Sequence, residues 1–185
     1  MDRPSPGRGR RRPAGAPSEA VALVTASPEA VPSGRMVLLK GVDARGFAFY
    51  TNYTSDKARD LEANPRAALL FFWPPDRQVR VSGRVTRTDP AESERYWRTR
   101  PRASQLSAWA SRQSRVVENR QVLEERVGEL ARRFAGADVP LPPFWGGYRL
   151  VPDAVEFWHH RDDRLHDRLR YRREGTGWVL ERLAP

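Results

Sequence analysis

The sequence predicts a single α+β domain that is mainly antiparallel β-sheet, with a few helices packed against the sheet. Three observations lead to this fold class. Short runs of β-branched and aromatic residues recur along the chain and are separated by turn-forming residues. Residues 78–87 alternate between apolar and polar side chains, as a strand with one buried face does. Helix signals are confined to residues 56–63, 89–99 and 118–134.

Length and composition narrow the class of protein. A chain of 185 residues is long enough for one domain with its own core and too short for two ordinary domains. The absence of cysteine excludes disulfides, thiolate metal sites and a cysteine nucleophile. No apolar run approaches the roughly 20 residues that a membrane helix needs, and the N-terminus lacks the apolar core of a secretory signal. We therefore expect a cytoplasmic protein without a membrane partner.

Positive charge is concentrated at the N-terminus and scattered elsewhere. The formal net charge is +10, and residues 1–20 are rich in Pro, Gly and Arg. Such a segment cannot offset the entropy of ordering, so we expect a disordered basic tail at residues 1–20 and the domain at residues 21–185. The tail could instead act as an electrostatic arm that touches phosphate or an acidic partner. A small phosphorylated ligand explains the scattered arginines as well as nucleic acid does, and nucleic acid is the weaker hypothesis.

The first half of the chain predicts strands and one short helix. Strands are expected at residues 20–25, 35–40, 47–51 and 67–73. The last of these is almost continuously apolar, as a strand covered on both faces would be. Ser55 is expected to cap the helix at residues 56–63, whose first turn would offer amide donors and the positive end of the helix dipole to an anion.

The second half begins with the alternating strand at residues 78–87, where Gly83 interrupts the pattern and suggests a curved barrel strand. Asp89-Pro-Ala-Glu92 is a strong helix start. The apolar stripe within residues 118–134 predicts an amphipathic helix packed on the barrel, with Gly136 as its stop. Further strands are expected at residues 154–158, 171–173 and 178–183.

One group of polar residues suggests a phosphate site, although neither a Rossmann nor a P-loop glycine motif occurs. Tyr96 and Arg100 are four residues apart and share a helix face, and Ser104 follows just past Pro101. Two hydroxyls and a guanidinium that converge there would form a phosphate clamp. The alternative is an ordinary surface helix.

A second group lies near the C-terminus. Arg164, His166 and Arg168 recur every second residue, so in an extended backbone all three side chains project to one face. Two guanidiniums that flank an imidazole would suit a planar, anionic heteroaromatic ligand. The alternative is a solvated edge strand, which on spacing alone is the more common case.

These residues belong to longer blocks that resemble the pyridoxine/pyridoxamine 5'-phosphate oxidases. The blocks are RxVLLK at 35–40, YTN at 50–52, YxxxRPxxSxxxAWxSxQS at 96–114, WGGY at 145–148 and RLHDRLRY at 164–171. The resemblance implies an FMN-binding split β-barrel that forms a homodimer with FMN at the subunit interface. It also implies oxidation of pyridoxine and pyridoxamine 5'-phosphate to pyridoxal 5'-phosphate, with O₂ as the electron acceptor and H₂O₂ as a product.

The resemblance also assigns residues to roles. FMN would be bound by Arg35, Met36, Val37, Leu38, Leu39, Lys40, Tyr50, Thr51, Lys57, Gln78, Gln113, Ser114, Trp158 and Arg168. The substrate would be bound by Lys40, Tyr96, Arg100, Ser104, Arg164, Leu165 and His166. Arg164 and His166 would be the catalytic residues, Gln113 and Ser114 would reach the FMN of the neighbouring subunit, and no metal is expected.

The sequence departs from the family pattern in two places. Asp56 stands where the family most often has Arg, and an acid beside a phosphate weakens binding unless its side chain points away. Residues 1–20 lack the helical pattern of the helix that covers the active site in relatives. Two other functions stay open: a related split-barrel flavin oxidase that acts on another ring, such as a phenazine precursor, and a non-catalytic flavin-binding protein.

Overall fold

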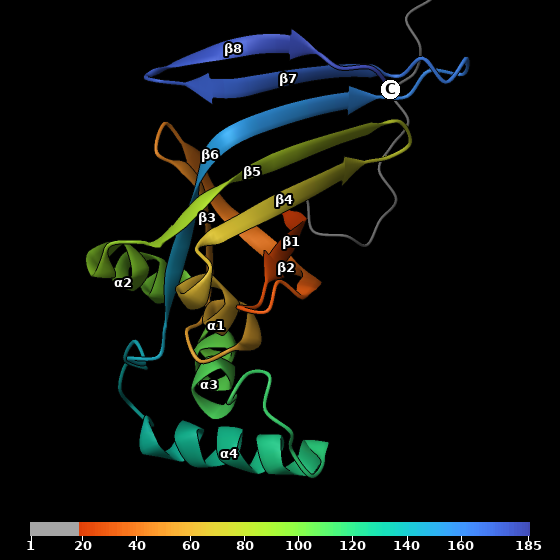
Figure 1. Ribbon diagram of the computed structural model, residues 1–185. Coiled ribbons are helices and arrows are strands. Elements are labelled where there is room, and N and C mark those ends of the chain that lie inside the picture. Colours follow the sequence, from red (N-terminus) through yellow and green to blue (C-terminus); the bar gives the residue numbers. More distant parts are fainter. Residues whose placement is uncertain (1–18) are drawn as a thin grey trace, which may run out of the picture.

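The computed structural model describes residues 19–185, so the expected disordered tail lies almost entirely outside the described residues. The elements are β1 Ala20–Ala26, β2 Pro32–Asp43, β3 Gly46–Asn52, α1 Asp56–Ala63, β4 Arg66–Trp73, β5 Arg77–Arg87, α2 Pro90–Thr99, α3 Arg102–Ala110, α4 Arg120–Arg133, β6 Trp145–His159, β7 Asp167–Glu174 and β8 Gly177–Arg182. Every strand pairing among them is antiparallel. The predicted α+β class is confirmed (Figure 1).

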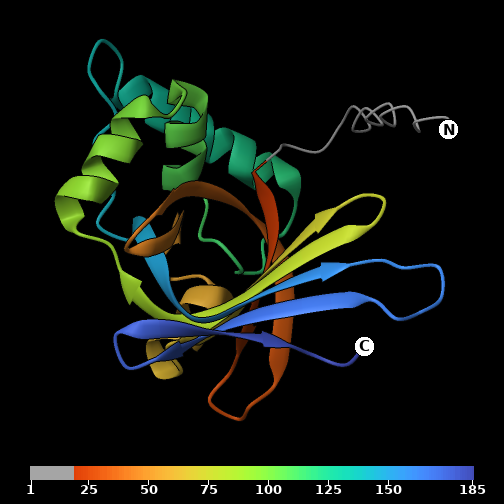
Figure 2. The ribbon, with the colours of Figure 1, turned by 90° about the horizontal axis from the view of Figure 1, so that it is seen from above.

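The strands form a split β-barrel. The sheet order is β3-β2-β1-β4-β5-β6-β7-β8, and a further pairing of β3 with β6 closes the first six strands into a barrel. The long strand β6 belongs to both parts, because residues 145–150 pair with β3 while residues 154–159 pair with β7. The β7–β8 hairpin therefore extends the sheet beyond the barrel, on the side away from α3 and α4 (Figures 1 and 2).

The barrel interior follows from the alternation in the sequence. Leu23, Phe49, Leu69, Val81 and Leu150 are fully buried inside it. Burial of each such side chain contributes about 1.5–3 kcal/mol relative to exposure, so the core is a main source of stability.

Gly83 marks the point at which β5 and β6 come closest. The register between the two strands shifts beside it, and a Cβ atom at Gly83 would lie 2.0 Å from the carbonyl oxygen of Val151. Only glycine fits this approach, and the register shift leaves Asp153 of β6 as the unpaired residue of a β-bulge opposite Ser82 and Gly83.

The prediction that β4 is covered on both faces is wrong for the single chain. Leu69 points into the core, but Leu70 is 37% exposed and Phe72 is 60% exposed. Met36 and Leu38 of β2 are also exposed on this outer surface of the barrel. A continuous apolar run shows only that both faces lack charge, and exposed apolar faces of this kind mark interaction surfaces.

The helices begin largely where the sequence predicts. The Asp89 carboxylate accepts a hydrogen bond of 2.7 Å from the backbone amide of Ala91 and caps α2. Ser55 stands at the N-cap position of α1, but its hydroxyl donates to the Asn52 carbonyl oxygen at 2.7 Å and makes no capping bond. No sequence signal predicted α3.

The expectation that residues 118–134 pack on the barrel needs correction. Helix α4 packs on α3, which lies between it and the barrel (Figure 1). The apolar stripe of α4, including Val127, Leu130 and Phe134, joins a second core around Trp97 and Leu106. An apolar stripe shows that a helix face is covered, but it does not identify the partner that covers it.

The extended row predicted at residues 164–168 is also wrong. Strand β7 begins only at Asp167, and Arg164 lies in the β6–β7 loop with a left-handed φ of 66°. The chain must reverse direction between two antiparallel strands, so the two-residue spacing of Arg164 and His166 is not that of a strand. The closing hairpin is confirmed as β7 and β8. Within the described residues, no helix is long and apolar enough to cross a membrane.

Candidate functional site

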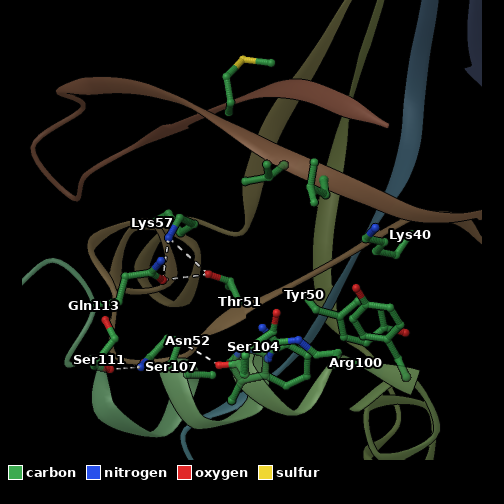
Figure 3. Close-up of a pocket in the computed structure, with 17 residues that line it drawn as sticks. Lys40, Tyr50, Thr51, Asn52, Lys57, Arg100, Ser104, Ser107, Ser111 and Gln113 are labelled. Carbon is green, nitrogen blue, oxygen red and sulfur yellow. Dashed lines mark hydrogen bonds between the residues drawn. The ribbon is translucent and has the colours of Figure 1, made fainter. Parts of the chain in front are cut away.

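A cavity of about 560 Å³ opens between the barrel and the helices (Figure 3). Side chains from β2, β3, α1, α2, α3 and β6 line it. The predicted site residues on its walls are Met36, Val37, Leu38, Lys40, Tyr50, Thr51, Lys57, Tyr96, Arg100, Ser104 and Gln113. The fold thus brings together predicted residues from three of the sequence blocks with Lys57 of α1.

Lys57 forms one end of the cavity. Its ammonium donates hydrogen bonds to Gln113 Oε1 at 3.0 Å and to the hydroxyls of Thr51 and Ser55 at 3.2 Å each. These partners within residues 19–185 are all neutral oxygens. Burial, with a smaller effect of the nearby Arg35 charge, lowers the pKa of Lys57 to about 8. A buried cation that has only neutral partners is a binding site for an anion.

Arg100 forms the other end, together with Lys40, Tyr96 and Ser104 (Figure 3). Its guanidinium carbon lies 4.6 Å from the centre of the Trp145 ring, which fixes its position by cation–π stacking. Arg100 Nη1 is buried and has no hydrogen-bond partner within the described residues. Burial lowers the pKa of Arg100. This orphaned donor fits a ligand oxygen.

The local sequence explains how Arg100 and Ser104 meet. Pro101 cannot continue α2, so Arg100 becomes its C-cap residue with an extended ψ of 140°. Helix α3 then starts at Arg102, and the Ser104 amide donates to the Pro101 carbonyl oxygen at 2.9 Å. The proline corner therefore places the two side chains on the same cavity wall, as the phosphate-clamp hypothesis requires.

A second group of predicted residues lies elsewhere on the chain. Gln78, Trp158 and Arg168 are direct neighbours across β5, β6 and β7. They line a small hollow of about 170 Å³. Arg168 donates to Glu156 at 2.8 Å, and this buried carboxylate, which is only 5% exposed, also pairs with Arg80.

The catalytic residues predicted by resemblance accompany this second group. Arg164, Leu165 and His166 lie in the β6–β7 loop, and the His166 ring centre is 4.8 Å from that of Trp158. None of the three lines the 560 Å³ cavity. One chain therefore holds the predicted site residues in two separate groups.

Besides Gln78, Trp158 and Arg168, three further predicted cofactor residues do not line the cavity. The Arg35 guanidinium donates to Thr25 and Ser33, although its charge acts on Lys57. Leu39 packs against the barrel core. Ser114 accepts a hydrogen bond of 3.2 Å from the backbone amide of Asp56 at the start of α1.

The prediction that Gln113 and Ser114 reach the FMN of a neighbouring subunit stays a prediction, and within its own chain Gln113 lies at the Lys57 end of the cavity. Gln113 Oε1 contacts both Lys57 and Thr51 of its own chain. The sequence suggested that Asp56 weakens phosphate binding unless its side chain points away. In the structure its carboxylate points to solvent and pairs with Arg59. The acid thus does not line the cavity, although its charge still reaches Lys57 and opposes the lowering of the Lys57 pKa.

Sequence reasoning missed Asn52, Ser107, Ser111 and Trp145 as cavity residues. Asn52 Nδ2 donates to the Ser111 carbonyl oxygen at 3.2 Å and ties the end of β3 to the end of α3. Two signals were present, since Asn52 directly follows Tyr50 and Thr51, and Ser107 lies one helical turn from Ser104.

Two family models match the chain. The first, described as pyridoxamine 5'-phosphate oxidase, matches residues 14–133. The second, described as the pyridoxine 5'-phosphate oxidase C-terminal dimerisation region, matches residues 145–185. The second segment contains β6, β7 and β8 and hence Trp158, Arg164, His166 and Arg168.

Individual relatives agree with the family models. The pyridoxine/pyridoxamine 5'-phosphate oxidase of Rubrobacter xylanophilus is 60% identical over 167 residues, covering 90% of this chain and 77% of the relative. The enzyme of the same name from Psychromonas ingrahamii is 52% identical over 168 residues, with the same two coverages of 90% and 77%.

Two solved structures share the fold of this chain. PhzG from Burkholderia lata 383, in complex with tetrahydrophenazine-1-carboxylic acid, is 35% identical with a TM-score of 0.85, covering 90% of this chain and 82% of that chain. An FMN-binding protein from Nostoc punctiforme related to pyridoxamine 5'-phosphate oxidase shares the fold with a TM-score of 0.71 at 19% identity, covering 90% and 87%. On the matches to both family models and to the curated relatives, the chain belongs to the pyridoxine/pyridoxamine 5'-phosphate oxidase family of enzymes.

Proposed function

We propose that this protein binds FMN and oxidises pyridoxine 5'-phosphate and pyridoxamine 5'-phosphate to pyridoxal 5'-phosphate, with O₂ as the final electron acceptor and H₂O₂ as a product. One observation carries the proposal. A single cavity has Lys57 at one end and Arg100 at the other. Lys57 is buried, Arg100 is half-buried with its Nη1 atom buried, and neither cation has a carboxylate partner among the described residues. Two anion sites in one cavity suit two phosphorylated molecules, a cofactor and a substrate.

The Lys57 end fits the FMN phosphate. Thr51 and Gln113 already hold the Lys57 ammonium, and the three side chains would exchange part of this network for phosphate oxygens. Met36, Val37 and Leu38 would line the cofactor along β2. When bound there, FMN supplies the two-electron acceptor that no side chain of the protein can provide.

The Arg100 end fits the substrate phosphate. The unpartnered Nη1 of Arg100, the Lys40 ammonium and the hydroxyls of Tyr96 and Ser104 are all donors on one wall of the cavity. Stacking of Arg100 on Trp145 holds its planar fork in place before the ligand arrives. Such a clamp would fix the phosphate and so orient the substrate ring within the same cavity.

In this proposal, the second group of residues completes the cavity of a second copy of the chain. Gln78, Trp158 and Arg168 lie outside the cavity of their own chain and within or beside the segment that matches the family dimerisation region. The exposed apolar surface around Leu70 and Phe72 lies on the same outer side of the sheet. We infer a homodimer in which each cavity is completed by this surface of the partner, with FMN at the subunit interface.

Arg164 and His166 would then face the substrate ring. His166 Nδ1 accepts a hydrogen bond of 3.0 Å from the Arg161 backbone amide, so a neutral imidazole carries its proton on Nε2. That proton can be donated to a polar substituent of the ring. Arg164 would supply a fixed positive charge beside it.

A second candidate function is oxidation of a different ring. It is favoured by the likeness to PhzG, whose crystal structure holds a tetrahydrophenazine carboxylic acid. The phosphate clamp argues for the B6 vitamers, because a single carboxylate would leave several of its donors without a partner.

Anaerobic absorbance spectroscopy tests the proposal. The FMN-supplemented protein is recorded before and after addition of pyridoxine 5'-phosphate. Bleaching of the flavin band near ~450 nm, with recovery in air, is the expected result for cofactor-borne redox chemistry. Bound flavin that does not bleach would favour the phenazine-type oxidase, and absence of bound flavin would overturn both candidates.

A further inference from the structure

Glu19 contacts Lys40, which lines the cavity. Its carbonyl oxygen accepts a hydrogen bond of 2.8 Å from the Leu39 amide, so its backbone continues the β1–β2 ladder that begins at Ala20 and Leu38. Its carboxylate forms an ion pair with the Lys40 ammonium. The backbone is therefore fixed, while the side chain is 49% exposed and free to rotate away.

Lys40 differs from the other two cavity cations. Lys57 has only neutral hydrogen-bond partners, and Arg100 Nη1 has none, within the part of the chain that the structure describes. Lys40, whose side chain is 21% exposed, is paired with an acid. The charge of one of the three cations is thus neutralised before any ligand enters.

A carboxylate oxygen and a phosphate oxygen compete for the same donor. Both accept a charge-assisted hydrogen bond from an ammonium, and a phosphate that approaches Lys40 must displace Glu19 or lie beside its negative charge. The hydrogen bond that Lys40 donates to Glu19, opposed by burial, raises the pKa of Lys40. Lys40 therefore stays charged near neutral pH with or without Glu19, so competition does not act through its protonation.

We propose that Glu19 is an internal competitor for the phosphate group that binds at Lys40, and that it limits how tightly the cavity holds a phosphorylated ligand. The identity of that ligand as a B6 phosphate ester rests on the proposed function. The same competition helps the phosphorylated product to leave, because the carboxylate replaces the departing phosphate on Lys40.

The size of the effect follows from the exposure of the pair. Half-exposed ion pairs are weak, so Glu19 occupies Lys40 only a few times more often than it leaves Lys40 free. The apparent affinity for phosphate falls by the same factor, which gives about three- to fivefold weaker binding than without Glu19. Higher salt weakens the competition, because the pair is partly screened.

Calorimetric titration of the FMN-supplemented, full-length protein tests the inference, with pyridoxal 5'-phosphate and inorganic phosphate as separate ligands. Glu19→Gln removes the carboxylate charge and keeps the shape of the side chain. Glu29→Gln is the matched control, because Glu29 lies in the turn at the opposite end of β1 and bonds only to that turn. Unphosphorylated pyridoxal controls for changes in the ring site.

The expected result is about three- to fivefold tighter binding of both phosphate ligands by Glu19→Gln, with no change for Glu29→Gln or for pyridoxal. Equal or weaker phosphate binding by Glu19→Gln would overturn the inference, even where pyridoxal 5'-phosphate binds well and the proposed function stands. Tighter binding of inorganic phosphate alone, with no binding of pyridoxal 5'-phosphate, would support the competition and count against the proposed function. Absence of binding by any form would overturn both.

Discussion

The side-chain oxygen of Gln113 lies 3.0 Å from the ammonium of Lys57, although the two residues are 56 positions apart in the sequence. This contact joins the start of α1 to the segment after α3 and closes one end of the cavity (Figure 3). Because all its partners are neutral, the Lys57 ammonium is held in place without being neutralised. The cavity therefore keeps a positioned charge for an incoming anion.

The affinity for FMN should fall as the pH rises through about 8, because the pKa of Lys57 in the free protein is lowered to about 8. An anion binds the charged ammonium better than the neutral amine, so deprotonation above this pH weakens binding. Flavin fluorescence titrations between about pH 7 and about pH 9 would measure the trend. Lys57→Arg keeps its charge throughout this range and should show a flat profile. An equally steep fall in this control would refute the role of Lys57.

Replacement of Arg100 by Met should weaken binding of pyridoxine 5'-phosphate by about 10- to 100-fold, the usual effect of losing charge-assisted hydrogen bonds. It should change the thermal stability little, because the buried Arg100 Nη1, which has no partner within the described residues, offsets the stacking on Trp145 that is lost. Arg100→Lys should be intermediate, since it keeps the charge but loses the planar fork. KM values for the phosphate ester and for unphosphorylated pyridoxine separate the effects. Equal losses for both substrates would contradict a phosphate-binding role.

Replacement of Arg164 by Leu should slow turnover far more than it weakens retention of FMN. Arg164 lies in the β6–β7 loop and, in the proposed dimer, faces the substrate ring and not the cofactor phosphate. The measurements are kcat and the ratio of flavin to protein after gel filtration. The control is Arg173→Leu, which removes an exposed arginine that stacks on Trp178. Similar losses of turnover and flavin in Arg164→Leu would reject the assignment.

Replacement of Glu156 by Gln should lower the free energy of unfolding by about 1–3 kcal/mol, since a buried charge-assisted network loses its acceptor charge. It should also weaken FMN binding, because Arg168 would no longer be held beside Trp158. Glu174→Gln removes an exposed acid that pairs with Arg172 and should change stability by less than about 0.5 kcal/mol. Urea unfolding of both variants measures the difference, and equal effects would argue against the positioning role of Glu156.

Replacement of Phe72 by Asp should convert the proposed dimer into monomers and abolish flavin binding. Phe72 lies on the open outer surface of β4 beside Gln78, and a buried carboxylate there would be unpaired in the interface. Sedimentation equilibrium measures the oligomeric state. Val116→Asp introduces the same charge at a fully exposed loop position and should leave the dimer intact. A Phe72→Asp variant that stays dimeric would place the interface elsewhere.

Local features of the fold could be predicted because their signals are local. Asp89, Pro90 and Glu92 specified the start of α2 within a few residues, and Gly83 marked the position in β5 that faces the bulge of β6. The helix α3 had no such signal, because its start is set by the proline corner and its cover by α4. Two predictions were wrong for a related reason, namely that α4 packs on the barrel and that β4 is covered on both faces. An apolar pattern indicates burial but does not identify the element that covers it.

The strands, the helix starts and the residue types that bind anions could be predicted from the sequence, because alternation, caps and motif blocks depend on neighbours along the chain. Which of those residues meet depends on the tertiary fold. Barrel closure through β3 and β6 and the α2–α3 corner bring Lys57, Gln113 and Arg100 to one cavity, while Trp158 and Arg168 stay outside it. Contacts of this kind depend on strand register and chain reversal over long sequence separations, which a one-dimensional pattern does not encode.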